Sequence, residues 1–98
     1  MRILWTNTAV SQLQAIHDYV AKTSPEYALL IVDRLTKRSV QIATFPFSGR
    51  RVPEFELNEV RQIIEGSYRI IYLIRDAEKR IEVLAVIHMA REGLDLLD

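Results

Sequence analysis

Apolar residues in the first half of the chain recur every three or four positions, which is the spacing of one face of an α-helix. A short apolar run over residues 2–6 comes first and is predicted to be a strand. The helix that follows has Thr6 or Asn7 as its predicted N-cap, because either side chain can accept a hydrogen bond from a free backbone N–H. The positions of this helix predicted to face the core are Val10, Leu13, Ile16 and Val20.

The sequence Thr-Ser-Pro at residues 23–25 predicts the end of the first helix and the start of a second. Proline disfavours helical backbone in the residue before it, so the first helix stops there. Ser24 as N-cap, Pro25 at the first helical position and Glu26 in the first turn are typical of a helix start. The short joint predicts an antiparallel helical hairpin. The inward positions predicted for the second helix are Ala28, Ile31, Val32, Leu35 and Ile42.

The second half of the chain carries three runs rich in β-branched and aromatic residues, which are typical of strands. They cover residues 60–65, 68–75 and 80–88, and the turns between them are Gly66-Ser67 and the polar residues 76–79. Two prolines and a glycine between residues 44 and 54 predict a loop without a regular element. The fold class predicted is α+β, with an N-terminal strand and an antiparallel helical hairpin packed on one face of a small antiparallel β-sheet.

The two turns also predict the register of the strands. A two-residue turn pairs Arg61 with Tyr72, and a four-residue turn, continued without interruption, pairs Ile71 with Leu84 and Arg69 with Val86. On this register Ile70, Tyr72 and Ile87 face the helices, while Arg69 and His88 become diagonal neighbours on the other face. A bulge in either strand would reverse the assignment beyond it.

The composition indicates one globular domain over residues 1–98. The chain is 49% hydrophobic and 27% charged, and no apolar run approaches the roughly 20 residues that span a bilayer. It has no cysteine, which excludes disulfides, thiol nucleophiles and cysteine zinc sites. The two histidines lack metal-ligand spacing, so neither metal nor cofactor is predicted. A cytoplasmic location is the default expectation.

The charges balance, with 13 basic and 13 acidic residues. Salt-driven, indiscriminate binding to nucleic acid usually requires a basic excess and is therefore not expected. Ten of the 13 basic residues are arginine, the side chain suited to bidentate contacts with phosphate or carboxylate. Both a positive patch and a mixed, solvated surface fit this distribution.

Arg69 and His88 interrupt strands that otherwise take apolar residues. A charge inside a central strand needs a specific partner, which for Arg69 is Glu54, Glu82 or an external anion. A histidine near Arg69 would have its charged form disfavoured, which suits a neutral acceptor or a base. A structural role at the end of a strand is the alternative for His88.

Arg50 and Arg51 lie on a glycine–proline turn that also carries Glu54. These residues fit phosphate or partner binding, with the carboxylate orienting an arginine. From their spacing alone, a solvated loop is the favoured reading, and its ion pair would contribute only about 0–1 kcal/mol.

The order of these segments resembles the RelE/ParE toxin superfamily over nearly the whole chain. The matching segments are Phe45-Pro46, Gly49-Arg50, Val52-Pro53-Glu54, Arg61, Tyr68-Arg69-Ile70-Ile71-Tyr72 and Val83-Leu84-Ala85-Val86-Ile87-His88 followed by Arg91. The resemblance implies the toxin of a type II toxin–antitoxin pair, associated with plasmid stabilisation. It also implies neutralisation by a small cognate antitoxin in a hetero-oligomeric complex.

The superfamily has two activities, and the resemblance is closer to the ParE side, whose members bind and inhibit DNA gyrase. RelE-like members cut mRNA on the ribosome with basic residues, a carboxylate and a tyrosine or histidine near the C-terminus. Here the tail after Arg91 is acidic and has neither. A toxin-fold binding module without toxicity is the third reading. The residues predicted to be catalytic, only for a ribonuclease, are Arg69, Glu54 and His88. The residues predicted to bind partners are Arg50, Arg51, Arg61, Arg69 and Arg91.

Overall fold

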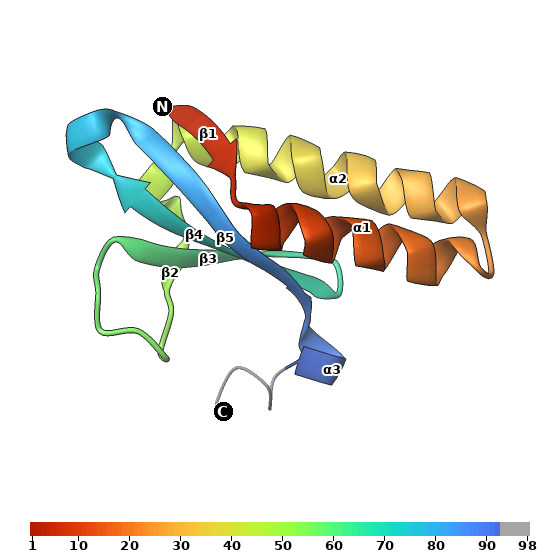
Figure 1. Ribbon diagram of the computed structural model, residues 1–98. Helices are drawn as coiled ribbons and strands as arrows, with labels where there is room; N and C mark the ends of the chain where they lie inside the picture. The colour runs from red at the N-terminus through yellow and green to blue at the C-terminus, as the bar shows by residue number, and fades with distance from the viewer. Residues whose placement is uncertain (93–98) are drawn as a thin grey trace.

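Two helices cover one face of a five-stranded sheet in the computed structural model, which describes residues 1–92 (Figure 1). The order along the sheet is β1-β5-β4-β3-β2, and β1 pairs with β5 in parallel while the other pairs are antiparallel. The predicted α+β fold is confirmed. The elements are β1 (Arg2–Trp5), α1 (Asn7–Ala21), α2 (Pro25–Thr44), η1 (Pro46–Ser48), β2 (Arg50–Arg51), β3 (Val60–Glu65), β4 (Tyr68–Arg75), η2 (Asp76–Glu78), β5 (Arg80–His88) and α3 (Met89–Glu92).

Both helices begin at the side-chain caps that the sequence predicts. The Thr6 hydroxyl accepts from the Ala9 N–H at 3.1 Å and donates to the Val83 carbonyl at 2.9 Å, so it joins α1 to the sheet. Ser24 accepts from the Tyr27 N–H at 3.1 Å. Among residues 1–92, no helix is long and apolar enough to cross a membrane.

The buried stripe of α1 differs from the prediction at one position. Ala9 and Ile16 are buried, and Leu13 and Val20 pack against the same core. Val10 is 47% exposed, so its predicted place in the core is wrong. Successive helical residues are about 100° apart, and the stripe therefore passes through Ala9 instead of its larger neighbour.

The loop after α2 contains two short elements, η1 and β2, where the sequence predicts none. Tyr72, which is fully buried, donates from its hydroxyl to the Pro46 carbonyl at 2.7 Å and fastens this segment to β4. A side chain at Gly49 would collide with that hydroxyl and with the Gln62 carbonyl, so only glycine lets the backbone approach so closely.

The register of β3 on β4 matches the prediction at every pair, from Glu65–Tyr68 to Arg61–Tyr72. The β4–β5 register matches only as far as Tyr72–Val83, because Ile71 then pairs with Ala85. The extra residue is Leu84. Such a bulge moves every later residue of the strand to the opposite face. The predicted pairs Ile71–Leu84 and Arg69–Val86 are therefore wrong.

The sheet buries apolar residues on both faces. The main core lies beneath the helices and includes Ile70, Tyr72, Val83 and Val86. A second cluster belongs to the other face, where Val52, Val60, Ile71 and Ile87 are buried together. The predicted positions of Ile70 and Tyr72 are confirmed, and that of Ile87 is wrong because of the bulge. The β2–β3 loop lies on the side of the sheet away from the hairpin (Figure 1).

Candidate functional site

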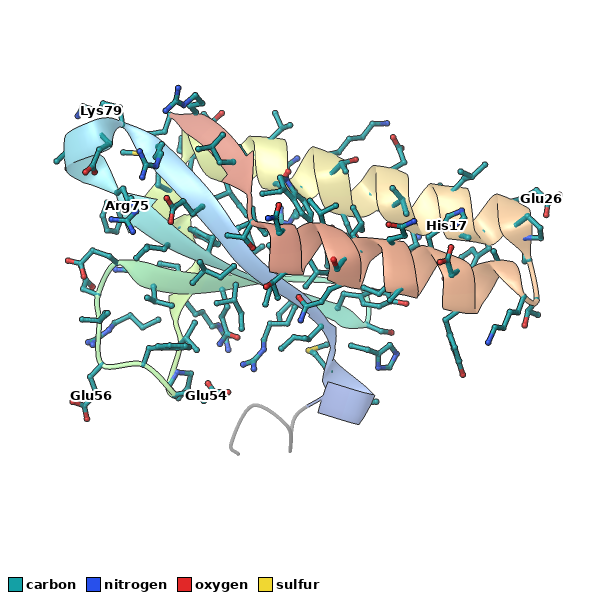
Figure 2. All side chains as sticks on the ribbon, in the orientation of Figure 1. His17, Glu26, Glu54, Glu56, Arg75 and Lys79 are labelled. Atoms are coloured by element: carbon teal, nitrogen blue, oxygen red, sulfur yellow. The ribbon has the colours of Figure 1, made fainter. Side chains whose placement is uncertain are left out.

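Arg69 lies on the sheet face away from the helices and has two partners there. Its Nη2 donates to Glu54 Oε2 at 3.0 Å, and its Nη1 donates to Gln62 Oε1 at 2.8 Å. The Arg69 and Glu54 side chains are only 14% and 18% exposed. Glu54 is contributed by the β2–β3 loop (Figure 2). The prediction that Arg69 needs a specific partner agrees with this ion pair.

The two carboxylate oxygens of Glu54 differ, because Oε2 accepts from Arg69 and Oε1 does not. The hydrogen bond from Arg69 holds the pKa of the Glu54 carboxyl below its ordinary value, and a backbone hydrogen bond at Glu54 acts in the same direction. Glu54 Oε1 is buried and has no hydrogen-bond partner among the described residues. Glu54 is thus an ionised carboxylate with one free acceptor atom.

His88 lies on the opposite face of the sheet from Arg69. It is paired with Tyr68 across β4 and β5, and the two rings meet edge to face with centroids 5.2 Å apart. Its Nδ1 accepts from the Ala90 N–H at 3.2 Å. The prediction that His88 is a diagonal neighbour of Arg69 is wrong, because the bulge at Leu84 moves the end of β5 to the helix-facing side.

Arg61 is held by the segments on both sides of β2. Its Nε donates to the Asn58 carbonyl at 2.7 Å, and its Nη1 donates to the carbonyls of Phe47 and Gly49 at 3.2 and 3.0 Å. The guanidinium also stacks on the Phe47 ring at 5.1 Å from the centroid. These contacts make Arg61 a support for η1 and β2.

Arg50 and Arg51 are exposed on β2, opposite Gln62 and Arg61 respectively. Neither makes a side-chain hydrogen bond or an ion pair within the described part of the chain. Arg50 borders an open hollow of about 560 Å³ that Arg38 and Ile64 also line. The side chain of Arg91, together with the acidic residues after it, lies outside what the structure describes.

Sequence reasoning missed Gln62 as the second partner of Arg69. The correctly predicted β3–β4 register already places it diagonally across from Arg69, so the register was the available signal. It also missed the pair of Arg38 with Glu65, at 3.8 Å, because that contact joins α2 to β3. No group of histidine, aspartate or glutamate in residues 1–92 is arranged to hold a metal ion.

The arrangement favours binding over proton transfer. A general acid and base must both reach the reacting atoms, and His88 and Glu54 are separated by the sheet. Arg69 Nη1 and Nη2 already donate to Gln62 and Glu54, which leaves fewer N–H donors for a phosphate. Arg50 and Arg51 of β2 are exposed cations that are available to a partner.

Comparison with known proteins identifies the class. Residues 3–93 match the family model described as the ParE toxin of the type II toxin–antitoxin system parDE. The chain therefore belongs to the ParE toxin family, within the RelE/ParE superfamily of toxins. The predicted resemblance is confirmed.

Individual relatives agree with that family. The chain is 29% identical to the protein Y4kP of Sinorhizobium fredii, over 98% of this chain and 96% of Y4kP. The assignment of Y4kP as a toxin is itself an inference. A solved structure of the chromosomal ParDE system from P. aeruginosa superposes with a TM-score of 0.73 and 26% identity, covering 90% of this chain and 95% of its own. A structure of the toxin–antitoxin complex RelBE2 from Mycobacterium tuberculosis shares the fold, with a TM-score of 0.61 and 23% identity over 89% of this chain and 88% of its own.

Proposed function

We propose that this protein binds and inhibits DNA gyrase as a ParE-like toxin and is neutralised by a cognate antitoxin. The observation that carries the proposal is the position of His88, which lies across the sheet from the Arg69–Glu54 pair. The family model, described for ParE toxins, supports the same choice.

A ribonuclease needs three functions at one phosphate. A base removes the proton of the ribose 2′-hydroxyl, an acid protonates the leaving oxygen, and a cation stabilises the charge of the transition state. General acid–base groups contribute about 10²–10⁴ in rate each, so a site that lacks one is severely impaired. Arg69 and Glu54 supply a cation and a base, but His88 is not within reach as the acid.

An antitoxin partner follows from the same family. The family model names the parDE system, and the P. aeruginosa relative with 26% identity is described as a ParDE toxin–antitoxin system. A hetero-oligomeric complex with the product of a neighbouring short reading frame is therefore expected. Plasmid stabilisation and a cytoplasmic location stay predictions.

Gyrase supercoiling assays with purified protein test the proposal. Wild-type protein should block supercoiling of relaxed plasmid, and the double variant Arg50→Glu/Arg51→Glu should lose most of this effect because it reverses the exposed charges of β2. The variant Arg2→Glu, which reverses an exposed charge on β1, serves as the matched control. His88→Ala should inhibit gyrase as well as wild type does.

One observation favours the ribonuclease alternative. Glu54 stays ionised beside Arg69, and a carboxylate must be ionised to act as a general base. Early arrest of translation after induction, with mRNA cleaved on ribosomes and with protection by Glu54→Gln, would replace the gyrase proposal. Normal growth, together with an intact antitoxin complex, would instead indicate a binding module without toxicity.

A further inference from the structure

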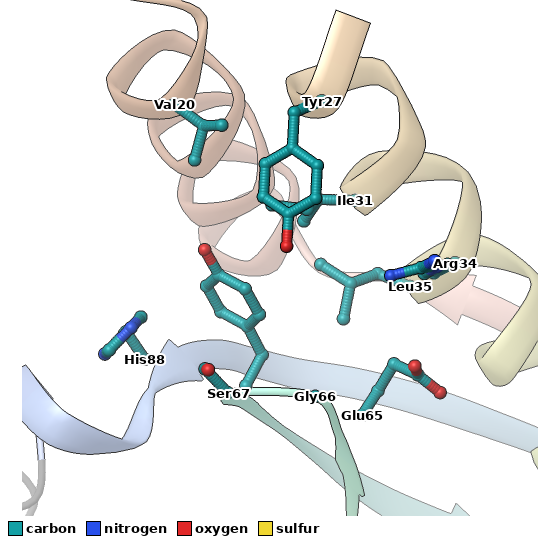
Figure 3. Close-up of a pocket in the computed structure, with 10 residues that line it drawn as sticks. Val20, Tyr27, Ile31, Arg34, Leu35, Glu65, Gly66, Ser67 and His88 are labelled. Carbon is teal, nitrogen blue, oxygen red and sulfur yellow. The ribbon is translucent and has the colours of Figure 1, made fainter. Parts of the chain in front are cut away.

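A hollow of about 260 Å³ lies between the tip of the helical hairpin and the β3–β4 turn (Figure 3). Val20 and Ile31 line it from α1 and α2, while Ser67 and His88 line it from the sheet. Pockets that hold small-molecule ligands usually measure about 300–1,000 Å³. The smaller volume suits one large side chain of another protein.

Tyrosines gather around this hollow. Tyr27 and Tyr68 line it, and Tyr19 lines an adjoining hollow that shares His88. Tyr27 is 50% exposed despite its size. Exposed tyrosines are frequent in protein interfaces, because each offers a large amphipathic contact area and has few rotatable bonds to immobilise. The surroundings of the hollow therefore resemble the centre of a protein-binding surface.

The lining of the hollow carries one acidic and one basic side chain, Glu65 and Arg34. Glu65 lines the hollow but faces Arg38 at 3.8 Å, so its charge is offset. Arg34 also lines the hollow and is exposed, and it makes no ion pair or hydrogen bond with any side chain that the structure describes. An arginine without a partner beside a cavity favours an occupant that carries a carboxylate.

We infer that this hollow receives a large aliphatic or aromatic side chain of the antitoxin, while an aspartate or glutamate of the same segment contacts Arg34. The inference rests on the proposed function, which supplies the antitoxin as the partner. Tyr27 forms one wall and provides contact area, and Arg34 fixes the direction of the bound segment.

The test measures the affinity of full-length toxin for the antitoxin encoded by the neighbouring reading frame, by isothermal titration calorimetry. Tyr27→Ala and Arg34→Glu should each weaken binding about tenfold or more, as the truncation of an interface hot spot does. Phe45→Ala and Arg2→Glu make the same kinds of change at exposed positions that do not line the hollow. These controls should change affinity by about threefold at most. Circular dichroism verifies that each variant is folded.

A charge exchange identifies the second contact. Each aspartate and glutamate of the antitoxin is replaced by lysine and combined with toxin Arg34→Glu. One such replacement should restore the lost affinity, which a merely structural role of Arg34 would not allow. A tight complex that tolerates all four toxin variants equally would overturn the inference and leave the antitoxin partner intact. Two folded wild-type proteins that form no complex would overturn both.

Discussion

Arg69 and Glu54 show how one charge in the interior of a sheet is made tolerable. A guanidinium that is 14% exposed would be costly alone, and the carboxylate of Glu54 and the amide of Gln62 compensate for its lost hydration. The side chains are tied to each other, so changing one leaves the other without its partner.

A double-mutant cycle on this pair has a defined outcome. Arg69→Met should lower the free energy of unfolding by about 1–3 kcal/mol, because Glu54 is then left buried and unpaired. Glu54→Gln in the same protein should recover part of that loss, with a coupling energy of about 0.5–3 kcal/mol in urea denaturation. Strictly additive losses would show that the two side chains do not stabilise each other.

Acid should destabilise the protein through two carboxyl groups. Arg69 holds the pKa of Glu54 below its ordinary value, and Arg75, followed by Arg80, does the same for Glu82. Both contributions are fully present above the unfolded pKa of about 4.3. They are lost as the pH falls through the lowered folded values, because the unfolded chain then binds more protons.

The measurement is urea denaturation between pH 7 and pH 2. The double variant Glu54→Gln/Glu82→Gln should be less stable than wild type at pH 7 and should lose less stability below about pH 4.5. Parallel curves for the two proteins would assign acid destabilisation to other carboxyl groups.

At the scale of elements, the local rules predict the helices and the first hairpin well. Gly66 has a φ of 60°, which its residue type allows, and the two-residue turn then fixes all the β3–β4 pairs. The bulge was not predictable, since Val83-Leu84-Ala85-Val86 is continuously apolar and no alternation marks the extra residue. The wrong prediction that His88 is a neighbour of Arg69 follows from the single extra residue, Leu84. The partner of Arg69 was predictable because it depends on charge compensation, not on the strand beyond the bulge.

Deleting the bulged residue tests this account of β5. Without Leu84, Val83 and Ala85 keep their partners and their faces, so the protein should fold. Stability should fall by about 1–3 kcal/mol because Leu84 is partly buried in the second cluster. Deleting Ile81 instead moves Glu82 toward a fully buried position and should prevent folding. Circular dichroism and NMR spectra of the backbone amides compare the two deletion variants. Similar behaviour of both would contradict this account of the bulge at Leu84.

At the scale of the whole molecule, β1 closes the sheet beside β5. The parallel register joins Arg2 to Arg80 and Trp5 to Val83, and the Met1 amino group donates to the Ala43 carbonyl at 3.0 Å. Removing residues 2–5 would leave β5 as an edge with unpaired backbone groups. Such edges promote association between chains.

The variant lacking residues 2–5 should therefore elute as oligomers in size-exclusion chromatography or fail to unfold cooperatively in urea. Leu4→Lys changes an exposed side chain of β1 without removing the strand and should remain a monomer. A truncated protein that is monomeric, with an unchanged midpoint, would show that β1 is dispensable.

The pairing of β1 with β5 also sets when the toxin can exist during its own synthesis. Val83 is added 78 residues after Trp5, which at about 5–20 residues per second is a delay of about 4–16 s. Before β5 is synthesised, the nascent chain contains the helical hairpin but lacks the strand with which β1 pairs. A ribosome that stalls or is released before β5 thus yields a fragment without the finished sheet, so the complete fold forms only after β5 has been synthesised.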